Sequence, residues 1–167
     1  GKTWEQPENL TRVAVQGDVN FDPWLETDGR GHFYTVHVLR SDGRPLIRRS
    51  KDAGKTWSNP LPIPWKHCDR PVLGVSPSGK QLVIAGSMSE LMATAPNFLE
   101  GNAPDRAAKL RASILFSSGV FLSADHGDSW ERIGDPFGDN EHAIPFSVVV
   151  DDRERVAASW ITEGNGS

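Results

Sequence analysis

Short apolar stretches, each followed by a polar turn and a second apolar stretch, recur three times along this chain of 167 residues. The first stretches begin near Asp22, Asp69 and Ala143. The second are rich in Val, Phe and Trp, alternate partly between apolar and polar residues, and cover 32–39, 81–85 and 155–161. Runs of this length and composition, bounded by Gly, Pro, Asp and Ser, are typical of β-strands joined by tight turns. The pattern therefore predicts three pairs of antiparallel strands.

An eight-residue motif, Ser-x-Asp-x-Gly-x-(Thr/Ser)-Trp, occurs at 50–57 and again at 123–130, and residues 1–4 match its second half. Asp suits a tight turn because its carboxylate accepts backbone N–H bonds, and Gly tolerates positive φ. The hydroxyls bond further turn amides, while Trp anchors the turn against apolar neighbours. We therefore interpret the fixed residues as structural: Ser50, Asp52, Gly54, Trp57, Ser123, Asp125, Gly127 and Trp130.

Together the two repeats predict an all-β unit of four antiparallel strands in roughly 50 residues, the size of a β-propeller blade. The boundaries predict blades at 19–64 and 65–138 and a split blade, whose last strand lies in 1–18 and whose first two strands lie in 139–167. Propellers close with about four to eight blades. The chain, which begins with Gly and not Met, is therefore expected to be part of a larger propeller, a processed piece, or a subunit completed by another chain.

An insertion at 86–113 is expected to separate the second and third strands of the second unit. Within it, 104–112 has Pro and Asp at the start and basic residues late, which favours a helix. A second short turn of helix is expected at 89–95. The sequence thus predicts a short helical insertion near 87–112.

Composition excludes several functions. The net charge is −4 and no block of like charge stands out, which disfavours nucleic-acid binding. No apolar run approaches 18 residues, so no membrane span is expected, and the given chain shows no signal peptide. Its single cysteine excludes an intrachain disulfide. The five histidines lack metal-ligand spacing and no Gly-rich phosphate loop precedes a helix, so neither metal nor cofactor is expected.

The eight-residue motifs resemble the Asp-box, or BNR repeat, of sialidases and related β-propellers. The phrases starting at Asp22 and Asp69 also resemble the innermost strands of bacterial sialidase-like proteins. This resemblance implies that the boxes lie on the rim, away from any active site, and serve the fold. It implies a glycan ligand, a glycoside hydrolase or a segment of one, and a secreted or periplasmic location.

Ligands of propellers usually approach the end opposite the boxed turns, where the chain passes from one blade to the next. Glycoside hydrolysis needs paired carboxylates, whereas the carboxylate-binding role of the family's arginines is not transferred to Arg70. The residues expected at that end are Asp69, Arg70 and Asp22 as catalytic candidates and His67, Glu141, His142 and Arg106 as substrate-binding candidates. The alternative is that Asp22 and Asp69 end their strands and hydrogen-bond local amides.

The chain departs from the sialidase pattern of three arginines, a Tyr nucleophile paired with Glu, and an Asp acid/base. Its one tyrosine, Tyr34, falls in mid-strand, where packing is the expected role, and the family's early Arg-Ile-Pro motif is missing. His67 and Cys68 are adjacent and would point to opposite faces, which disfavours a Cys/His nucleophile pair. Two alternatives therefore stay open: an incomplete enzyme, or a non-catalytic carbohydrate- or protein-binding scaffold completed by oligomerisation.

Overall fold

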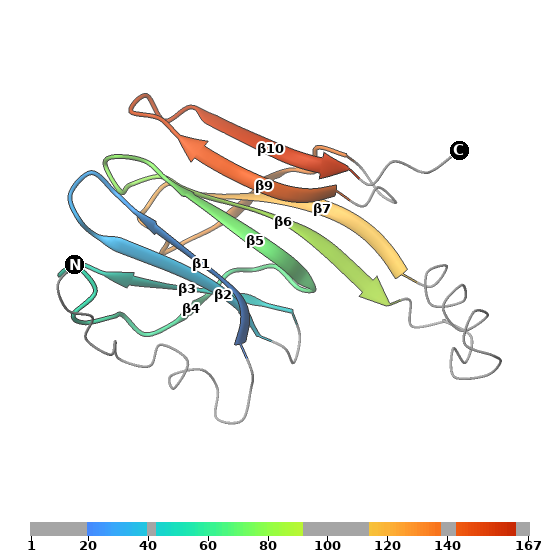
Figure 1. Ribbon diagram of the computed structural model, residues 1–167, viewed down its shortest axis with the longest axis horizontal. Coiled ribbons are helices and arrows are strands. Elements are labelled where there is room, and N and C mark those ends of the chain that lie inside the picture. The colour runs from blue at the N-terminus through green and yellow to red at the C-terminus, as the bar shows by residue number, and fades with distance from the viewer. Residues whose placement is uncertain (1–19, 40–42, 92–113, 138–142, 163–167) are drawn as a thin grey trace, which may run out of the picture.

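The described part of the chain forms ten β-strands in three antiparallel sheets (Figure 1). The computed structural model describes residues 20–39, 43–91, 114–137 and 143–162. These residues form no helix, and so none that is long and apolar enough to cross a membrane. The strands are β1 (Asn20–Thr27), β2 (Phe33–Leu39), β3 (Pro45–Ser50), β4 (Leu61–Pro62), β5 (Cys68–Val75), β6 (Leu82–Leu91), β7 (Ile114–Ser123), β8 (Glu131–Gly134), β9 (Ala143–Val150) and β10 (Val156–Thr162).

Within each sheet, consecutive strands pair with each other. The first sheet has the order β1-β2-β3-β4, the second has the order β5-β6-β7-β8, and the third is the pair β9–β10. The predicted four-stranded antiparallel units and the three predicted strand pairs are thereby confirmed. The first strand of each later sheet packs on the sheet before it, since β5 contacts β1 and β2, and β9 contacts β5 and β6. The described residues form no closed ring, and the split blade stays a prediction.

Matching bulges interrupt the first strands of the first two sheets. In β1, Phe21 pairs with Val38 and Trp24 with Val36, so two residues, Asp22 and Pro23, stand opposite one. In β5 the same extra residue occurs at Arg70 and Pro71, between the pairs of Asp69 and Val72. Such bulges bend a strand and re-aim its side chains. The two sheets therefore turn the same short segment of their first strand in the same way.

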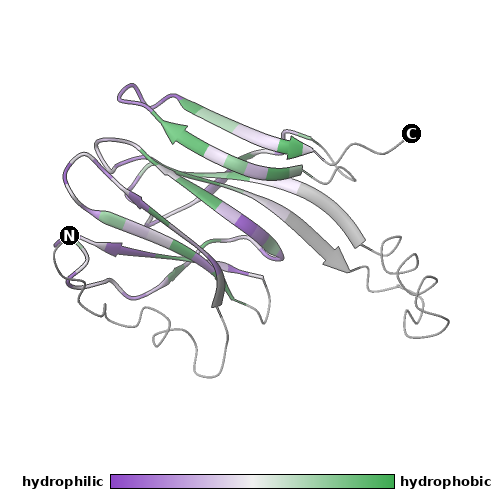
Figure 2. Cartoon of the chain, in the orientation of Figure 1, coloured by the Kyte–Doolittle hydropathy of each residue, from purple (hydrophilic) through white to green (hydrophobic). Residues whose placement is uncertain are grey.

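Two apolar layers hold the three sheets together. Between the first and second sheets, Val36 and Ile47 belong to the same buried cluster as Leu73, Leu82 and Ile84. Between the second and third sheets, the buried cluster consists of Val72, Val83, Ala85, Val148 and Val150. The apolar residues lie mainly along the strands, which also carry polar residues, and the turns are mostly polar (Figure 2). Each large aliphatic side chain buried here stabilises the fold by about 1.5–3 kcal/mol.

Trp65, in the connection between β4 and β5, joins the first unit to the second. It is 3% exposed, and its ring stacks on Phe121 with 4.8 Å between centroids. Two glycines that pair across β6 and β7 lie beneath the ring. A Cβ added to Gly86 would come within 2.5 Å of the indole, and one added to Gly119 within 3.1 Å. The indole therefore occupies the space that side chains on these two strands would fill.

The predicted insertion begins later than expected. Residues 86–91 continue β6 and pair with 114–119 of β7, so placing the insertion from 86 onward was wrong, as was a helical turn starting at Ser89. Gly, Ser and Met have little strand preference, but pairing with β7 gives 86–91 cross-strand partners that local sequence cannot reveal. The predicted helix at 104–112 lies outside the described residues, and the described part supports no helical insertion.

Substitution of Gly86 tests the packing of Trp65. Gly86→Ala forces the indole or the strand to move, so we expect a loss of about 1–3 kcal/mol in the free energy of unfolding. Gly134→Ala is the matched control, because a Cβ at Gly134 meets nothing within 4 Å, and its effect should stay within about 0.5 kcal/mol. Denaturant unfolding followed by Trp fluorescence measures both. Equal stability of the two variants would contradict the close approach.

Candidate functional site

The antiparallel order gives the first two sheets two distinct ends. The start of β1 lies beside the end of β2 and the start of β3, since Phe21 pairs with Val38 and Val38 with Pro45. The boxed turns follow the ends of β3 and β7 and therefore lie at the opposite end. The predicted separation of the candidate site from the boxed turns agrees with this strand order.

Four of the seven predicted site residues lie in the described part, and all four are at the end opposite the boxes. Asp22 and Arg70 occupy the two bulges, and the backbone N–H of Arg70 donates to the Asp22 carboxylate at 3.2 Å. Asp69 precedes Arg70, and His67 ends the connection from β4. Asp22, His67 and Asp69 are half-buried, whereas Arg70 is exposed. Glu141, His142 and Arg106 lie outside the described residues.

Three of these four residues have a left-handed backbone. The φ angles are 50° at Asp22, 58° at His67 and 50° at Arg70. For residues other than glycine this conformation costs about 1–3 kcal/mol and persists only where the surroundings impose it. At His67 the neighbour is Gly43, where an added Cβ would lie 2.5 Å from the His67 Cα. The backbone at this end is therefore held in a specific shape.

Cys68 lies beneath this end of the sheets. It is 2% exposed, and its N–H donates to the Gly43 carbonyl at 2.8 Å. Burial, with the nearby Asp69 and Asp22 carboxylates, raises the pKa of the thiol well above its usual value. Because the thiolate is the nucleophilic form, burial disfavours a catalytic role for this cysteine.

An open depression of about 560 Å³ lies beside His67. Its walls combine apolar rings with two basic residues, and its lining is Arg44, Pro62, Ile63, Pro64, Trp65 and Lys66. No group of three or more His, Cys, Asp or Glu side chains within the described ranges could hold a metal ion. The depression therefore combines apolar surface with a basic rim.

The two boxed turns are stabilised by the same hydrogen bonds. In each, the Ser hydroxyl donates to the box Asp and accepts the N–H of the box Gly, at 2.8 Å for both Gly54 and Gly127. The Asp carboxylate accepts from the backbone and the hydroxyl of the Thr or Ser four residues later. The Trp Nε1 donates to the Gly carbonyl. These contacts agree with a structural role for the motif, whose family assignment is untested.

These bonds stabilise the ionised carboxylates. Hydrogen bonds from the Thr56 hydroxyl and backbone, and from Ser50, lower the pKa of Asp52 to about 2. The corresponding bonds from Ser129 and Ser123 lower the pKa of Asp125 further below its usual range. Both carboxylates are therefore charged at neutral pH, and both are hydrogen-bonded within their own turns.

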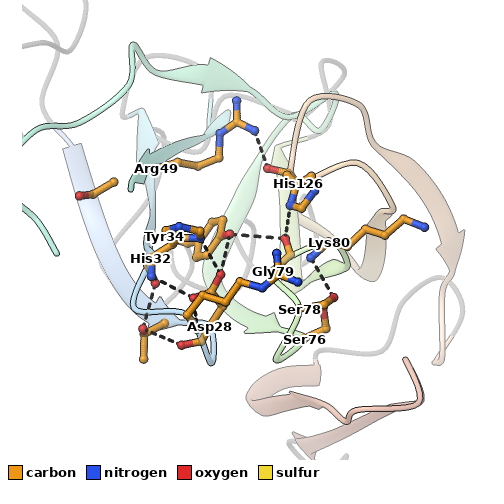
Figure 3. A network of polar contacts seen from close by, with 12 residues as sticks. Asp28, His32, Tyr34, Arg49, Ser76, Ser78, Gly79, Lys80 and His126 are labelled. Atoms are coloured by element: carbon orange, nitrogen blue, oxygen red, sulfur yellow. Dashed lines mark hydrogen bonds and ion pairs between the residues drawn. The ribbon is translucent and has the colours of Figure 1, made fainter. Parts of the chain in front are cut away.

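A polar network that the sequence did not reveal joins the first two sheets at the boxed end (Figure 3). The Asp28 side chain is fully buried, accepts the N–H groups of Arg30 and His32, and contacts His32 Nδ1 at 2.8 Å. Burial raises the pKa of Asp28, but the hydrogen bonds from His32 and Arg30 outweigh this effect and lower it below its usual value. The Asp-Gly turn after a strand is the one signal that could have identified this residue.

Gly79 and His126 extend this network to the second sheet. The Gly79 carbonyl is 2.8 Å from His126 Nδ1, and the His126 carbonyl accepts from Arg49 at 2.7 Å. Arg49 also bonds the Asp128 carboxylate at 2.7 Å. The two hairpin turns, β3 and the second boxed turn are thereby connected.

Tyr34 belongs to this network and not to the candidate site. It is 3% exposed, and its hydroxyl lies 3.4 Å from both the Asp28 carboxylate and the Gly79 carbonyl. Burial and the negative charge of Asp28 raise its pKa to about 12. The predicted packing role of Tyr34 is confirmed. Tyr34 is the single tyrosine of the sequence, and it lies at the boxed end and not beside Asp22.

The comparisons with known proteins give a likeness of fold. No family model and no curated protein match the sequence. The structure is similar to "Hadza microbial sialidase Hz136", with a TM-score of 0.54 and 16% identity over 98% of this chain and 38% of that chain. A protein of unknown function from Dyadobacter fermentans DSM 18053 gives a TM-score of 0.39 and 14% identity over 91% and 64%. The chain thus spans less than two thirds of either, and the sialidase shares its arrangement of antiparallel β-sheets.

The boxed carboxylates predict how stability responds to acid. Because the pKa of Asp52 is lower in the folded chain, its contribution is present above the unfolded value of about 3.9 and is lost as the pH falls toward 2. Asp52→Asn should lower the melting temperature at pH 7 and flatten its fall between pH 4 and 2. Asp152→Asn, at an exposed turn position between β9 and β10, should retain the wild-type profile. Calorimetry across this pH range measures both, and parallel profiles for all three proteins would contradict the assignment.

Proposed function

We propose that this chain is part of an Asp-box β-propeller of the sialidase type that is directed at glycans. The proposed glycan-binding face comprises Asp22, His67, Asp69 and Arg70. The observation that carries the proposal is the hydrogen bond from the Arg70 N–H to the Asp22 carboxylate, because it joins the bulges of two neighbouring first strands. The structural likeness to a sialidase supports the fold on which this proposal rests.

The chemistry of this end suits an anionic sugar. An exposed Arg can bind a carboxylate through two parallel hydrogen bonds, and a carboxylate such as Asp22 accepts from sugar hydroxyls. Arg44 and Lys66 add positive charge beside His67, next to apolar surface that can contact a sugar ring. Left-handed backbone at three of the four residues gives this face a specific shape. The ligand class that fits best is a glycan bearing a carboxylate.

Hydrolysis is the further part of this proposal. Asp22 and Asp69 supply two carboxylates, the minimum that glycosidic cleavage requires. Sialidases also use a tyrosine nucleophile, and Tyr34 is buried at the other end of the sheet. Any hydrolase of sialidase type would therefore draw further catalytic residues from outside the described part. We also propose a secreted or periplasmic location, on the resemblance of the boxes alone.

A non-catalytic binding scaffold is the second candidate function. It is favoured by the same hydrogen bond, since the Asp22 carboxylate already accepts from the backbone amide of Arg70 and so has a structural role. In that case the face binds a carbohydrate or protein without turnover.

Binding and turnover measurements on a glycan panel that includes sialosides test these proposals. We expect Arg70→Ala to weaken binding of a carboxylate-bearing glycan by roughly 10- to 100-fold, because a charge-assisted pair is lost. Arg153→Ala, in the exposed β9–β10 turn, is the matched control and should leave affinity unchanged. Calorimetric titration measures both.

The outcomes separate the candidate functions. Cleavage of a fluorogenic glycoside that Asp69→Ala abolishes supports a hydrolase, and binding without cleavage supports a scaffold. Absence of binding to every glycan, or equal loss in the Arg70 and Arg153 variants, would overturn the proposed face.

A further inference from the structure

The open depression beside His67 combines apolar surface with two cations. Ile63 and Trp65, which are 0% and 3% exposed, form its buried apolar part, and the prolines on either side of Ile63 are exposed next to them. Arg44, just before β3, and Lys66 are both exposed and carry the positive charges. Cations next to apolar rings suit an acidic sugar, because the rings contact its C–H groups and the cations bind its carboxylate.

Trp65 also brings an unpaired hydrogen-bond donor to this place. Its Nε1 is buried and has no hydrogen-bond partner in the described part of the chain. The indole atoms closest to Gly86 and Gly119 belong to the six-membered ring. Because that ring is the part of the side chain farthest from the backbone, the five-membered ring with Nε1 lies toward the 62–66 segment that lines the depression. Buried polar groups are normally hydrogen-bonded, so this N–H suits an acceptor that enters the depression.

A close contact holds the two segments that carry the cations against each other. The Gly43 carbonyl accepts the Cys68 N–H at 2.8 Å, and a Cβ added to Gly43 would lie 2.5 Å from the His67 Cα. Arg44 follows Gly43 in the chain, and Lys66 precedes His67. The depression is thereby attached to the same connection that leads into the proposed glycan-binding face.

The depression also lies within reach of Arg70. Lys66 and Arg70 are four residues apart in the chain. Even a fully extended backbone spans at most roughly 14 Å over four residues. A short oligosaccharide can therefore contact both places at once.

We infer that the depression is a second subsite for an acidic sugar, which takes the carboxylate of one residue of a glycan while Arg70 binds the carboxylate of another. This inference rests on the proposed function and narrows its ligand class from a glycan bearing a carboxylate to an oligosaccharide bearing two or more. Lys66 and Arg44 pair with the second carboxylate, and the Trp65 N–H donates to an oxygen of the same sugar.

Calorimetric titration of the whole chain with two trisaccharides tests this subsite. Sialyllactose carries a single carboxylate, whereas a trimer of sialic acid carries one on every sugar. We expect the trimer to bind at least roughly tenfold more tightly at low salt, because a second charge-assisted pair forms. Lys66→Ala should weaken trimer binding by roughly 5- to 10-fold and change sialyllactose binding by less than about twofold. Lys66→Arg, which keeps the charge, should retain most of the trimer affinity.

Lys55→Ala is the matched control. It removes the same charge from an exposed residue of the first boxed turn, at the opposite end of the sheet. Both affinities should stay within about twofold of the wild-type values, because exposed charges separated by more than about 10 Å are largely screened at 0.1 M salt.

The Trp65 indole N–H gives a second readout that requires no substitution. Its proton resonance can be assigned through the Phe121 ring, which stacks on the indole. We expect this resonance to shift when the trimer is added and to stay in place with sialyllactose. A resonance that the trimer leaves unmoved would overturn the inference.

The outcomes separate this inference from the proposed function. Arg70→Ala should weaken binding of both trisaccharides, since each places a carboxylate there. If sialyllactose binds through Arg70 but the trimer binds no more tightly, or if Lys66→Ala and Lys55→Ala weaken trimer binding equally, the second subsite is wrong and the proposed face stands. If the wild-type chain binds neither trisaccharide, both are overturned.

Discussion

The structure depends on one recurring contact, the packing of a first strand onto the first two strands of the sheet before it. Between the second and third sheets, this contact places a branched side chain of the incoming strand over a glycine of the sheet before it. Val148 lies over Gly74, where an added Cβ would meet its side chain at 2.7 Å. Because protein interiors are close-packed, such a pairing fixes the separation and angle of two sheets together.

How well the sequence predicts a part of this structure depends on how far apart in the sequence its interacting residues lie. The boxed turns were predictable because their hydrogen bonds close within eight residues, from Ser50 to Trp57. Tyr34 was predictable for a similar reason, since a strand-centre aromatic between apolar neighbours is normally buried. Trp65 was not, because its site exists only when Gly86 and Gly119 come into register. The full length of β6 depends on the same register.

The candidate site divides in the same way. Strand order alone placed Asp22, His67, Asp69 and Arg70 at one end, opposite the boxes. Their fine geometry could not be predicted, because left-handed φ angles at Asp22 and Arg70 follow from bulges that no local preference of Asp or Arg demands. The buried role of Asp28 was not predicted, because an Asp before Gly is usually only a turn residue. Its burial arises from the approach of Gly79, a residue of a different hairpin.

The buried thiol beneath the bulges gives the molecule an internal probe of its own motions. Cys68 is the single cysteine of the chain and lies under the candidate binding face. While the first two sheets stay packed, the side chain is inaccessible to an alkylating reagent, so its labelling rate measures how often this region opens. A ligand that binds only the closed form slows labelling in proportion to its occupancy, whatever its chemical identity. The thiol thus reports on ligand binding without an engineered label.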